Sequence, residues 1–394
     1  MVPVFLPAAV FGLGQGASAP VIALQARELG ASVGVAGLIV AILGLGQVLG
    51  DMPAGTIVAR IGERNAVLLG TAIGTVGVAL CIFAWTPLLL GIGVGLSGVA
   101  NAVWGLARQS YVVDTVPMEL RGRALSAMAG LMRLGFLVGP FLGAVLVLFM
   151  GPRGGFVVQL AAVLGAGVLM LAMPRVASDA GSAAAMPLWR VLSLNRQVLR
   201  TLGLGAVVMG AARASRQAVL PLWADHIGLD PVVTSLLFGL GAAVDVALSY
   251  PAGRWMDMRG LAGRRPITVG SLILFAASHL ALPLAGGVVS LAAVALLMGL
   301  ANGLSNGVIQ TIGADVAPEQ GRTEFLGSFR LCHDVGMLFG PLIISGVSAA
   351  AGLAWAAAAL GGVSGAGAAG FARWLPFRPQ SSASVPASVR PSTK

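Results

Sequence analysis

Five ionisable residues interrupt long apolar stretches of the chain: Asp51, Arg133, Asp245, Arg330 and Asp334. A charged group inside an apolar segment is costly, so it usually pairs with an opposite charge or faces a water-filled cavity. A carboxylate in such surroundings can also bind and release a proton, which is the chemistry of proton-coupled transport. Arg330 and Asp334 are four residues apart, so on a helix they could instead form a local ion pair. These residues therefore indicate either proton exchange or structural ion pairing.

A second group of polar side chains recurs at helical spacing within apolar stretches. Arg213 and Arg216 share one helix face with Gln217, so the two guanidinium groups could bind an anionic group. Pairing with Asp334 inside the protein is the alternative. Other members of this group could line a substrate cavity or form hydrogen bonds between helices. They are Gln15, Asn101, Trp104, Asn302, Asn306 and Gln310.

Helices within a lipid bilayer must position these residues. The chain has 394 residues, of which 57% are hydrophobic and 10% charged, whereas about 25% of residues are charged in ordinary soluble domains. So few charges exclude a soluble enzyme, a disordered chain and a disulfide scaffold. The cysteines and histidines lack metal-ligand spacing, and no glycine-rich segment ends in the Gly-Lys-Ser/Thr of a phosphate-binding loop. We therefore expect no enzyme activity, no cofactor or metal, and no nucleic-acid partner.

Apolar runs of the length that crosses a bilayer, about 20 residues, predict an all-α membrane protein with twelve transmembrane helices. They lie at 3–24, 34–58, 66–84, 88–110, 124–149, 155–173, 201–222, 232–253, 267–285, 288–313, 325–349 and 354–372. Of the 24 basic residues, 18 lie on one side of these helices and only Arg27 and Arg153 on the other. Because Lys and Arg mark the cytoplasmic side, we predict a multi-pass protein of the cytoplasmic (inner) membrane with both termini in the cytoplasm.

The two halves of the chain repeat each other. Pro53-Ala54-Gly55 recurs as Pro251-Ala252-Gly253, and the Gly-x3-Gly-Pro motif at 135–140 recurs at 336–341. Parallel repeats of this kind are typical of transporters whose substrate site lies between the halves. We predict two pseudo-symmetric six-helix bundles, at 1–173 and 201–377, joined by a cytoplasmic linker at 174–200. A disordered cytoplasmic tail is predicted at 378–394, which is rich in Ser and Pro.

Twelve helices, a duplicated half and these loop motifs together resemble the major facilitator superfamily, and within it the twelve-helix branch of drug–proton antiporters. The resemblance implies a cytoplasmic charge cluster that holds the halves together in one state of the transport cycle. The matching residues are Gly55, Arg60, Gly62, Arg64, Asp114, Arg121, Gly253, Asp257, Gly260, Arg265, Asp315 and Arg322. Ala59 replaces the family's Asp in the first half, so we expect a weaker cluster there unless Asp51 or Asp114 substitutes for it.

The resemblance also assigns an antiporter signature to the fifth helix, at Gly135, Gly139, Pro140 and Gly143. Close packing of helices through small residues would explain the same glycines. The basic residue that the family often carries early in the fourth helix is absent, and Gly91 and Gly93 stand in that region. Arg108, near the other end of that helix, is not an obvious substitute.

In the fold that the resemblance implies, the second helix faces the eleventh and the fifth faces the eighth. Two cross-domain ion pairs follow as hypotheses: Arg133 with Asp245, and Asp51 with Arg330. The implied function is secondary transport by alternating access, specifically proton-coupled export of small amphipathic or drug-like molecules by a monomer in the lipid bilayer. An uptake symporter for a small metabolite, anionic if the two arginines bind it, remains the alternative.

Overall fold

The computed structural model describes residues 2–117, 120–171, 193, 195–318 and 322–375, without the side chains of residues 2–4, 113–114, 122, 261–262 and 322–324. Every regular element in these ranges is helical. The elements are α1 (Val2–Ser18), α2 (Val21–Glu28), α3 (Val33–Ile82), α4 (Pro87–Thr115), α5 (Arg121–Met150), α6 (Arg153–Leu171), α8 (Arg196–Val198), η2 (Leu199–Gly203), α9 (Leu204–His226), α10 (Pro231–Ala281), η3 (Leu282–Leu284), α11 (Val288–Leu304), α12 (Val308–Val316), α13 (Arg322–Ala351) and α14 (Leu353–Trp374). Most of the linker predicted at 174–200, and all of the tail predicted at 378–394, lie outside the described residues.

Ten helical segments among the described residues are long and apolar enough to cross a membrane. One of them, Val33–Ile82, has 50 residues, which is enough for two spans of about 20 residues each. The 23-residue helix α9 is also long enough, although its two arginines and other polar residues leave it outside the ten. With α3 taken as two spans and α9 added, these segments correspond to the twelve predicted spans. The predicted all-α membrane fold is confirmed.

Two long helices change direction at a glycine where consecutive spans meet. The backbone is non-helical at Gly62 in α3, where φ is 78°, and at Gly260 in α10, where φ is 53°. Glycine adopts positive φ without the steric penalty that a Cβ atom would bring. Both glycines were predicted as members of the repeated loop motif. The internal repeat therefore includes the backbone conformation that connects neighbouring spans.

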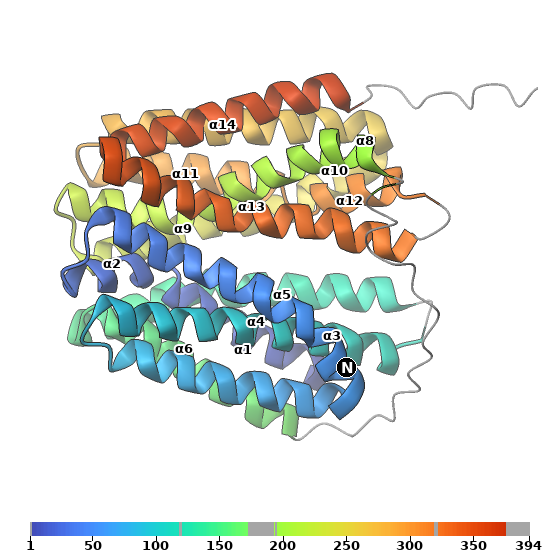
Figure 1. Ribbon diagram of the computed structural model, residues 1–394, viewed down its shortest axis with the longest axis horizontal. Coiled ribbons are helices and arrows are strands. Elements are labelled where there is room, and N and C mark those ends of the chain that lie inside the picture. The colour runs from blue at the N-terminus through green and yellow to red at the C-terminus, as the bar shows by residue number, and fades with distance from the viewer. Residues whose placement is uncertain (1, 118–119, 172–192, 194, 319–321, 376–394) are drawn as a thin grey trace, which may run out of the picture.

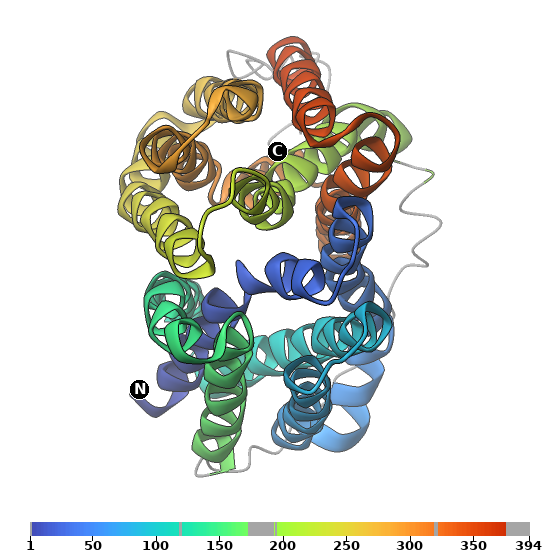
Figure 2. The same cartoon turned by 90° about the vertical axis from the view of Figure 1, so that its left-hand side faces the viewer.

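The helices form two groups that lie side by side, α1–α6 and α9–α14 (Figures 1 and 2). Across the boundary, α3 packs against α13 and α5 packs against α10. A Cβ atom at Gly37 of α3 would contact the Ser345 backbone, and one at Gly239 of α10 would contact the Phe141 ring. The second span thus faces the eleventh and the fifth faces the eighth, as the resemblance implied.

The two ends of the molecule are packed differently. We call the end that carries Gly62 and Gly260 the linker end (right in Figure 1), and the opposite end, where α2 ends, the far end. At the far end both halves contribute to one hydrophobic cluster, the far-end core, which includes Ile22, Trp223 and Phe238. Towards the linker end each half has a cluster of its own. The halves are therefore joined by apolar packing at the far end.

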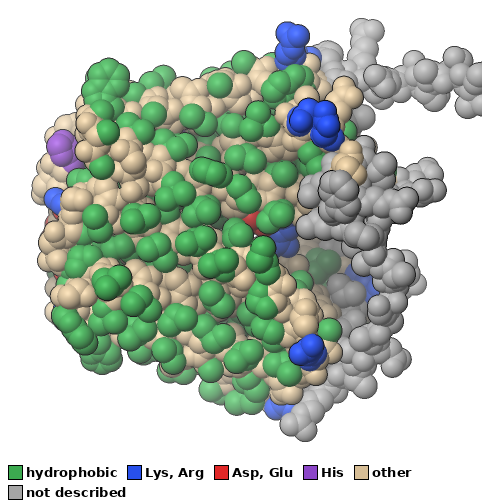
Figure 3. All heavy atoms as spheres, viewed as in Figure 1, with side chains coloured by type: hydrophobic (Ala, Val, Ile, Leu, Met, Phe, Trp, Pro, Cys, Tyr) green, Lys and Arg blue, Asp and Glu red, His purple; other side chains and the backbone are tan. Residues whose placement is uncertain are grey.

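An ion pair also joins the halves at the far end. The Nε atom of Arg27, near the end of α2, lies 2.8 Å from Oδ2 of Asp225 in α9. Nη1 of Arg27 donates to the carbonyl oxygen of Ala31 at 2.7 Å, which fixes the guanidinium. On the face drawn in Figure 3, hydrophobic side chains cover the middle and most basic side chains lie towards the linker end. This distribution fits a belt that contacts lipid.

Candidate functional site

A central cavity of about 550 Å³ lies between the two halves. Its apolar wall includes Phe11, Phe136 and Phe156, together with Met132 and Met337. Its polar lining consists of Gln15, Ser18, Gln47, Asp51, Ser97, Asn101, Arg108, Gln109, Gln159, Gln217, Arg330 and Asp334. Of the residues predicted from the sequence, the lining therefore includes Gln15, Asn101 and Gln217, and the three charged residues Asp51, Arg330 and Asp334. A cavity that combines an apolar wall with polar and charged side chains suits small amphipathic molecules.

Acidic and basic side chains face the central cavity from both halves. Nε of Arg330 lies 3.5 Å from Oδ2 of Asp334, which is the local ion pair that their spacing allowed. Nδ1 of His333 lies 3.3 Å from the other carboxylate oxygen of Asp334. Asp51 of α3 makes no hydrogen bond or ion pair with any residue that the structure describes, although Arg330 and Asp334 are within electrostatic range. The hypothesised pair of Asp51 with Arg330 is therefore not formed in this conformation, in which Arg330 contacts Asp334 instead.

Asp245 is at the centre of a buried polar network in the second half. Nδ2 of Asn302 donates to one carboxylate oxygen of Asp245 at 2.5 Å, and Nδ2 of Asn306 donates to the other at 2.6 Å. Arg213 of α9 donates to Oδ1 of Asn306 at 2.8 Å and to Oγ of Ser305 at 2.6 Å. These bonds tie α9, α10 and the break between α11 and α12 to one another. They favour the structural alternative for Asn302, Asn306 and Arg213, none of which lines the central cavity.

Arg133 is not paired with Asp245 in this conformation, among the residues that the structure describes. It is within electrostatic range of Asp245, whose carboxylate oxygens accept hydrogen bonds from the two asparagines. Arg133 instead lines a second cavity, of about 520 Å³, between α4 and α5. The hypothesis of this cross-domain pair did not account for hydrogen bonds that Asp245 receives within its own half.

Three other residues predicted for the substrate cavity lie outside it. The Arg216 guanidinium is buried over the Phe238 ring, 4.8 Å from its centroid, and its Nη1 has no hydrogen-bond partner among the described residues. Trp104 is buried and stacks on Phe11, with ring centroids 4.2 Å apart. Gln310 of α12 is exposed. Trp104 thus supports one wall of the central cavity through Phe11, whereas Arg216 lies inside the second half.

Several cavity residues were missed from the sequence, and most of them lie on α3 and α4. Gln47 precedes Asp51 by one helical turn, so both side chains lie on the same face of α3. In α4, Asn101, Arg108 and Gln109 are seven and eight residues apart and form a polar stripe along one face. That spacing was visible in the sequence. It identifies Arg108, which was not expected to have a role, as part of the cavity wall.

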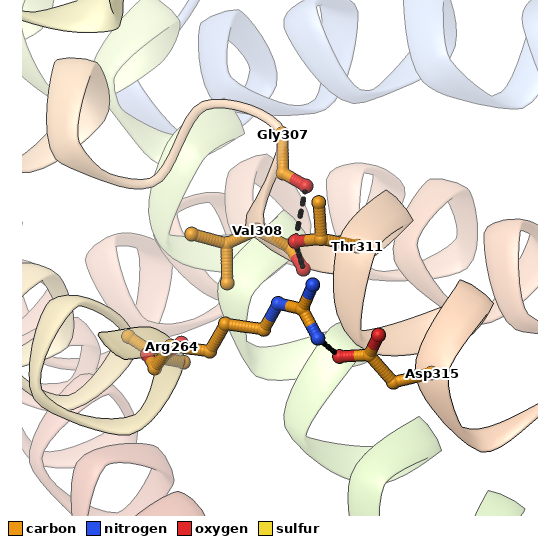
Figure 4. A network of polar contacts seen from close by, with 6 residues as sticks. Arg264, Gly307, Val308, Thr311 and Asp315 are labelled. Atoms are coloured by element: carbon orange, nitrogen blue, oxygen red, sulfur yellow. Dashed lines mark hydrogen bonds and ion pairs between the residues drawn. The ribbon is translucent and has the colours of Figure 1, made fainter. Parts of the chain in front are cut away.

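The predicted charge clusters at the linker end form contacts within each half. Figure 4 shows Arg264 of α10 paired with Asp315 of α12, next to the turn in which Thr311 donates to the carbonyls of Gly307 and Val308. The arginine that pairs with Asp315 is thus Arg264, the neighbour of the predicted Arg265. The predicted Asp257 is exposed on α10.

In the first half, where Ala59 replaces the Asp of the motif, the next carboxylate along the chain is that of Glu63. Glu63 is only 4% exposed and accepts a hydrogen bond from Oγ of Ser110 at 3.3 Å. The predicted Arg64 donates to the carbonyl of Leu171 at 2.5 Å, and Arg121 donates to the carbonyl of Val116 at 3.2 Å. The side chains of Asp114 and Arg322 lie outside the described residues. Glu63, which follows Gly62, was missed because the motif places its acid before that glycine.

Comparison with known proteins identifies the family. The model of the Major Facilitator Superfamily matches residues 4–261 and 202–393 of the chain. The chain belongs to the major facilitator superfamily. It is therefore a multi-pass membrane protein and a secondary transporter of small molecules, not an enzyme.

Individual relatives are distant. The transporter is 24% identical to the multidrug resistance protein MdtH of Salmonella newport (strain SL254) over 293 residues. This matched region covers 73% of this chain and 70% of MdtH. A mutant of the nucleoside transporter NupG has the same fold, with a TM-score of 0.79, 12% identity, and 94% and 98% of the two chains covered. A bacterial homolog of the human lysosomal transporter Spinster, in an inward-facing and unoccupied conformation, gives a TM-score of 0.69 at 17% identity, covering 94% and 93%.

The glycines of the fifth-helix signature bring two helices of this transporter into close contact. A Cβ atom at Gly135 would collide with the carbonyl oxygen of Ala9, and one at Gly139 would collide with that of Leu13. Gly143 is less crowded, with the nearest atom, the carbonyl oxygen of Ala17, 3.2 Å from its Cβ position. The corresponding glycines of α13 meet backbone carbonyls of α9 in the same way. Packing of α5 on α1 therefore accounts for the first two glycines.

Replacing Gly135 by alanine is expected to destabilise the transporter by about 1–3 kcal/mol, because the added methyl group must displace the α1 backbone. The measurement is thermal unfolding of the detergent-purified protein. Gly130→Ala is the matched control on the same helix, since its Cβ would have no atom within 4 Å. Equal unfolding temperatures for the two variants would show that this packing does not limit stability.

Proposed function

We propose that this transporter exports small amphipathic molecules in exchange for protons by alternating access. The observation that carries the proposal is the central cavity, in which an apolar wall faces Asp51, a carboxylate without a partner among the described residues. The apolar wall suits the apolar part of a substrate. Asp51 is available either to a proton or to a substrate, which is the competition that an exchange mechanism needs.

The packing of the two ends supports a conformation that admits substrate from the linker end. The far-end core and the Arg27–Asp225 ion pair join the halves on one side of the cavity. On the other side, each half has its own hydrophobic cluster, and the Arg264–Asp315 pair lies within the second half. If the linker end is cytoplasmic, as the distribution of basic residues predicts, this is the state in which an exporter loads its substrate.

The similarity to MdtH agrees with export, because that relative is named for multidrug resistance. Uptake with protons is the second candidate, and Arg108 is the observation that favours it. Its guanidinium lines the central cavity and could bind an anionic metabolite. The two arginines on which this alternative first rested, Arg213 and Arg216, do not line the cavity.

The direction of transport can be tested with everted membrane vesicles that are acidified inside. Two fluorescent probes are used, ethidium as an amphipathic cation and 2-naphthalenesulfonate as a permanently charged amphipathic anion. If one proton is exchanged per substrate molecule, each pH unit supports about tenfold accumulation of the substrate inside the vesicles. A difference of one pH unit and a tenfold concentration ratio both correspond to about 1.4 kcal/mol. Vesicles without the transporter and vesicles treated with nigericin are the controls. Loss of preloaded probe from acidified vesicles would indicate symport instead, and an unchanged distribution across a broad panel of amphiphiles would refute drug export.

A further inference from the structure

Arg108 of α4 is a buried cation without an adequate partner. Its side chain is 8% exposed, and its guanidinium carbon lies 5.3 Å from the centroid of the Trp104 ring. Its Nη1 and Nη2 atoms contact only the sulfur of Met132, at 3.3 and 3.4 Å, and its Nε has no partner among the described residues. A thioether is a weak acceptor. A buried guanidinium in this position is expected to have a stronger acceptor bound to it during the protein's function.

The second cavity brings another arginine to the same place. This cavity of about 520 Å³ is lined by Arg108 and Gln109 of α4 and by Leu125, Arg133 and Phe136 of α5, among others. No acidic side chain belongs to its lining within the described part of the chain. Arg108 has no acidic group within electrostatic range there either. The described lining of this cavity therefore carries two positive charges and no negative one, although the cavity lies within the hydrophobic span of α5.

Among the described residues, Asp245 acts electrostatically on Arg133 but does not remove this excess of positive charge. Asp245 is within electrostatic range of Arg133, but it accepts hydrogen bonds from Asn302 and Asn306. The same carboxylate is also within electrostatic range of Arg213 and Arg216. One carboxylate therefore faces several arginines. An anion between Arg108 and Arg133 would lower the cost of keeping these charges in the membrane.

The second cavity adjoins the central one, because Arg108, Gln109, Met132 and Phe136 line both. A molecule that extends from one to the other would place a charged group against the arginines and its apolar body against Phe136 and the wall of the central cavity. The remaining lining of the second cavity is largely apolar, so a small inorganic anion would leave most of it unfilled.

We propose that Arg108 and Arg133 form a subsite for the anionic group of an amphipathic molecule, a sulfonate, carboxylate or phosphate whose apolar body occupies the central cavity. Two planar guanidinium groups can each donate paired hydrogen bonds to the oxygen atoms of such a group. This inference rests on the proposed function in taking the central cavity as the substrate site. The molecule comes either from the aqueous phase as substrate or from the bilayer as an anionic lipid.

The test compares two probes of the same shape, 2-naphthalenesulfonate and the neutral 2-naphthalenesulfonamide. Their binding to the full-length transporter in phosphatidylcholine nanodiscs is measured by equilibrium dialysis, without a pH gradient. We expect the sulfonate to bind at least about tenfold more tightly, which corresponds to about 1.4 kcal/mol. Arg108→Gln and Arg133→Gln should each reduce this preference severalfold, because they weaken binding of the sulfonate more than binding of the sulfonamide. Because no gradient is applied, the result does not depend on coupling or on the direction of transport.

Three further measurements make the result decisive. Arg123→Gln, an exposed position on α5, is the matched control and should leave the preference unchanged. Arg108→Lys should keep part of the preference for the sulfonate. If Arg108→Gln does not fold, the test relies on Arg133→Gln alone. Phosphatidylglycerol added to the nanodiscs should compete with the sulfonate, in an arginine-dependent manner, only if the anion comes from the bilayer. Equal binding of the two probes to the wild type, or a preference that survives both Arg→Gln variants, overturns the proposal.

Discussion

Replacing Asp51 by asparagine is expected to reduce accumulation driven by a pH gradient to the level of vesicles without the transporter. Asparagine has nearly the same size but cannot exchange a proton. Among the carboxylates that line the central cavity, Asp334 is held by Arg330 and His333, whereas Asp51 has no partner among the described residues. The measurement is probe accumulation in acidified everted vesicles. Exchange of labelled for unlabelled substrate at equal pH should persist, because it requires no net proton movement.

Asp230→Asn is the matched control for Asp51→Asn. Asp230 accepts a hydrogen bond from the backbone nitrogen of Val232 at 2.7 Å and caps the start of α10 at the far end. Asparagine caps a helix about as well as aspartate, so this variant removes a carboxylate without a structural penalty. If Asp51→Asn retains the pH-gradient-driven accumulation of the control, the coupling proton does not bind at Asp51.

The fold could be predicted from the sequence because it depends on features that recur along the chain. Apolar runs of spanning length, the excess of arginine on one side and the repeated glycine motifs each report on many residues at once. Gly62 and Gly260 illustrate this. Both were identified from the motif alone, and both have the positive φ that explains why glycine is needed there.

The contacts of the site were harder to predict, because they depend on competition between nearby partners. The spacing of Asn302 and Asn306 predicted one shared helix face, but it shows neither the break after Leu304 nor that both side chains meet Asp245. Their hydrogen bonds leave Arg133 without its hypothesised partner. Arg330 shows the same effect, since Asp334 is one turn away on the same helix and Asp51 is on another. Charge and the implied pairing of helices suggested the cross-domain pairs, whereas the contacts formed in this conformation are local to the second half.

In the proposed mechanism, the two groups of charged residues have different roles, one in stability and the other in motion. The bonds of Asp245 lie entirely within the second half and connect three of its segments. They suit a bundle that moves as one rigid body. Asp51 and the Arg330–Asp334 pair instead face each other across the boundary between α3 and α13. In the proposed mechanism, a proton or a substrate bound at Asp51 would therefore act where the two halves separate and rejoin.

Replacing Asp245 by alanine is expected to lower the stability of the transporter by about 3–5 kcal/mol, the usual cost of removing one partner from a buried charged network. The side chain is 9% exposed. Its loss leaves the Nδ2 groups of Asn302 and Asn306 without their carboxylate acceptor, and it leaves the positive charge of Arg213 uncompensated. The measurement is thermal unfolding of the purified protein, followed by the amount of monodisperse protein recovered.

Asp257→Ala separates this effect from the loss of any carboxylate on α10, because Asp257 is exposed on the same helix. That control should change stability little. A double-mutant cycle with Asn302→Leu tests the cause of the loss. If the unpaired amide contributes to the cost, Asp245→Ala and Asn302→Leu together should cost less than the sum of the single variants. Additive costs would show that the contact with Asn302 does not explain the loss of stability. A stable Asp245→Ala variant that has lost transport would assign Asp245 to the transport cycle instead of the rigid body.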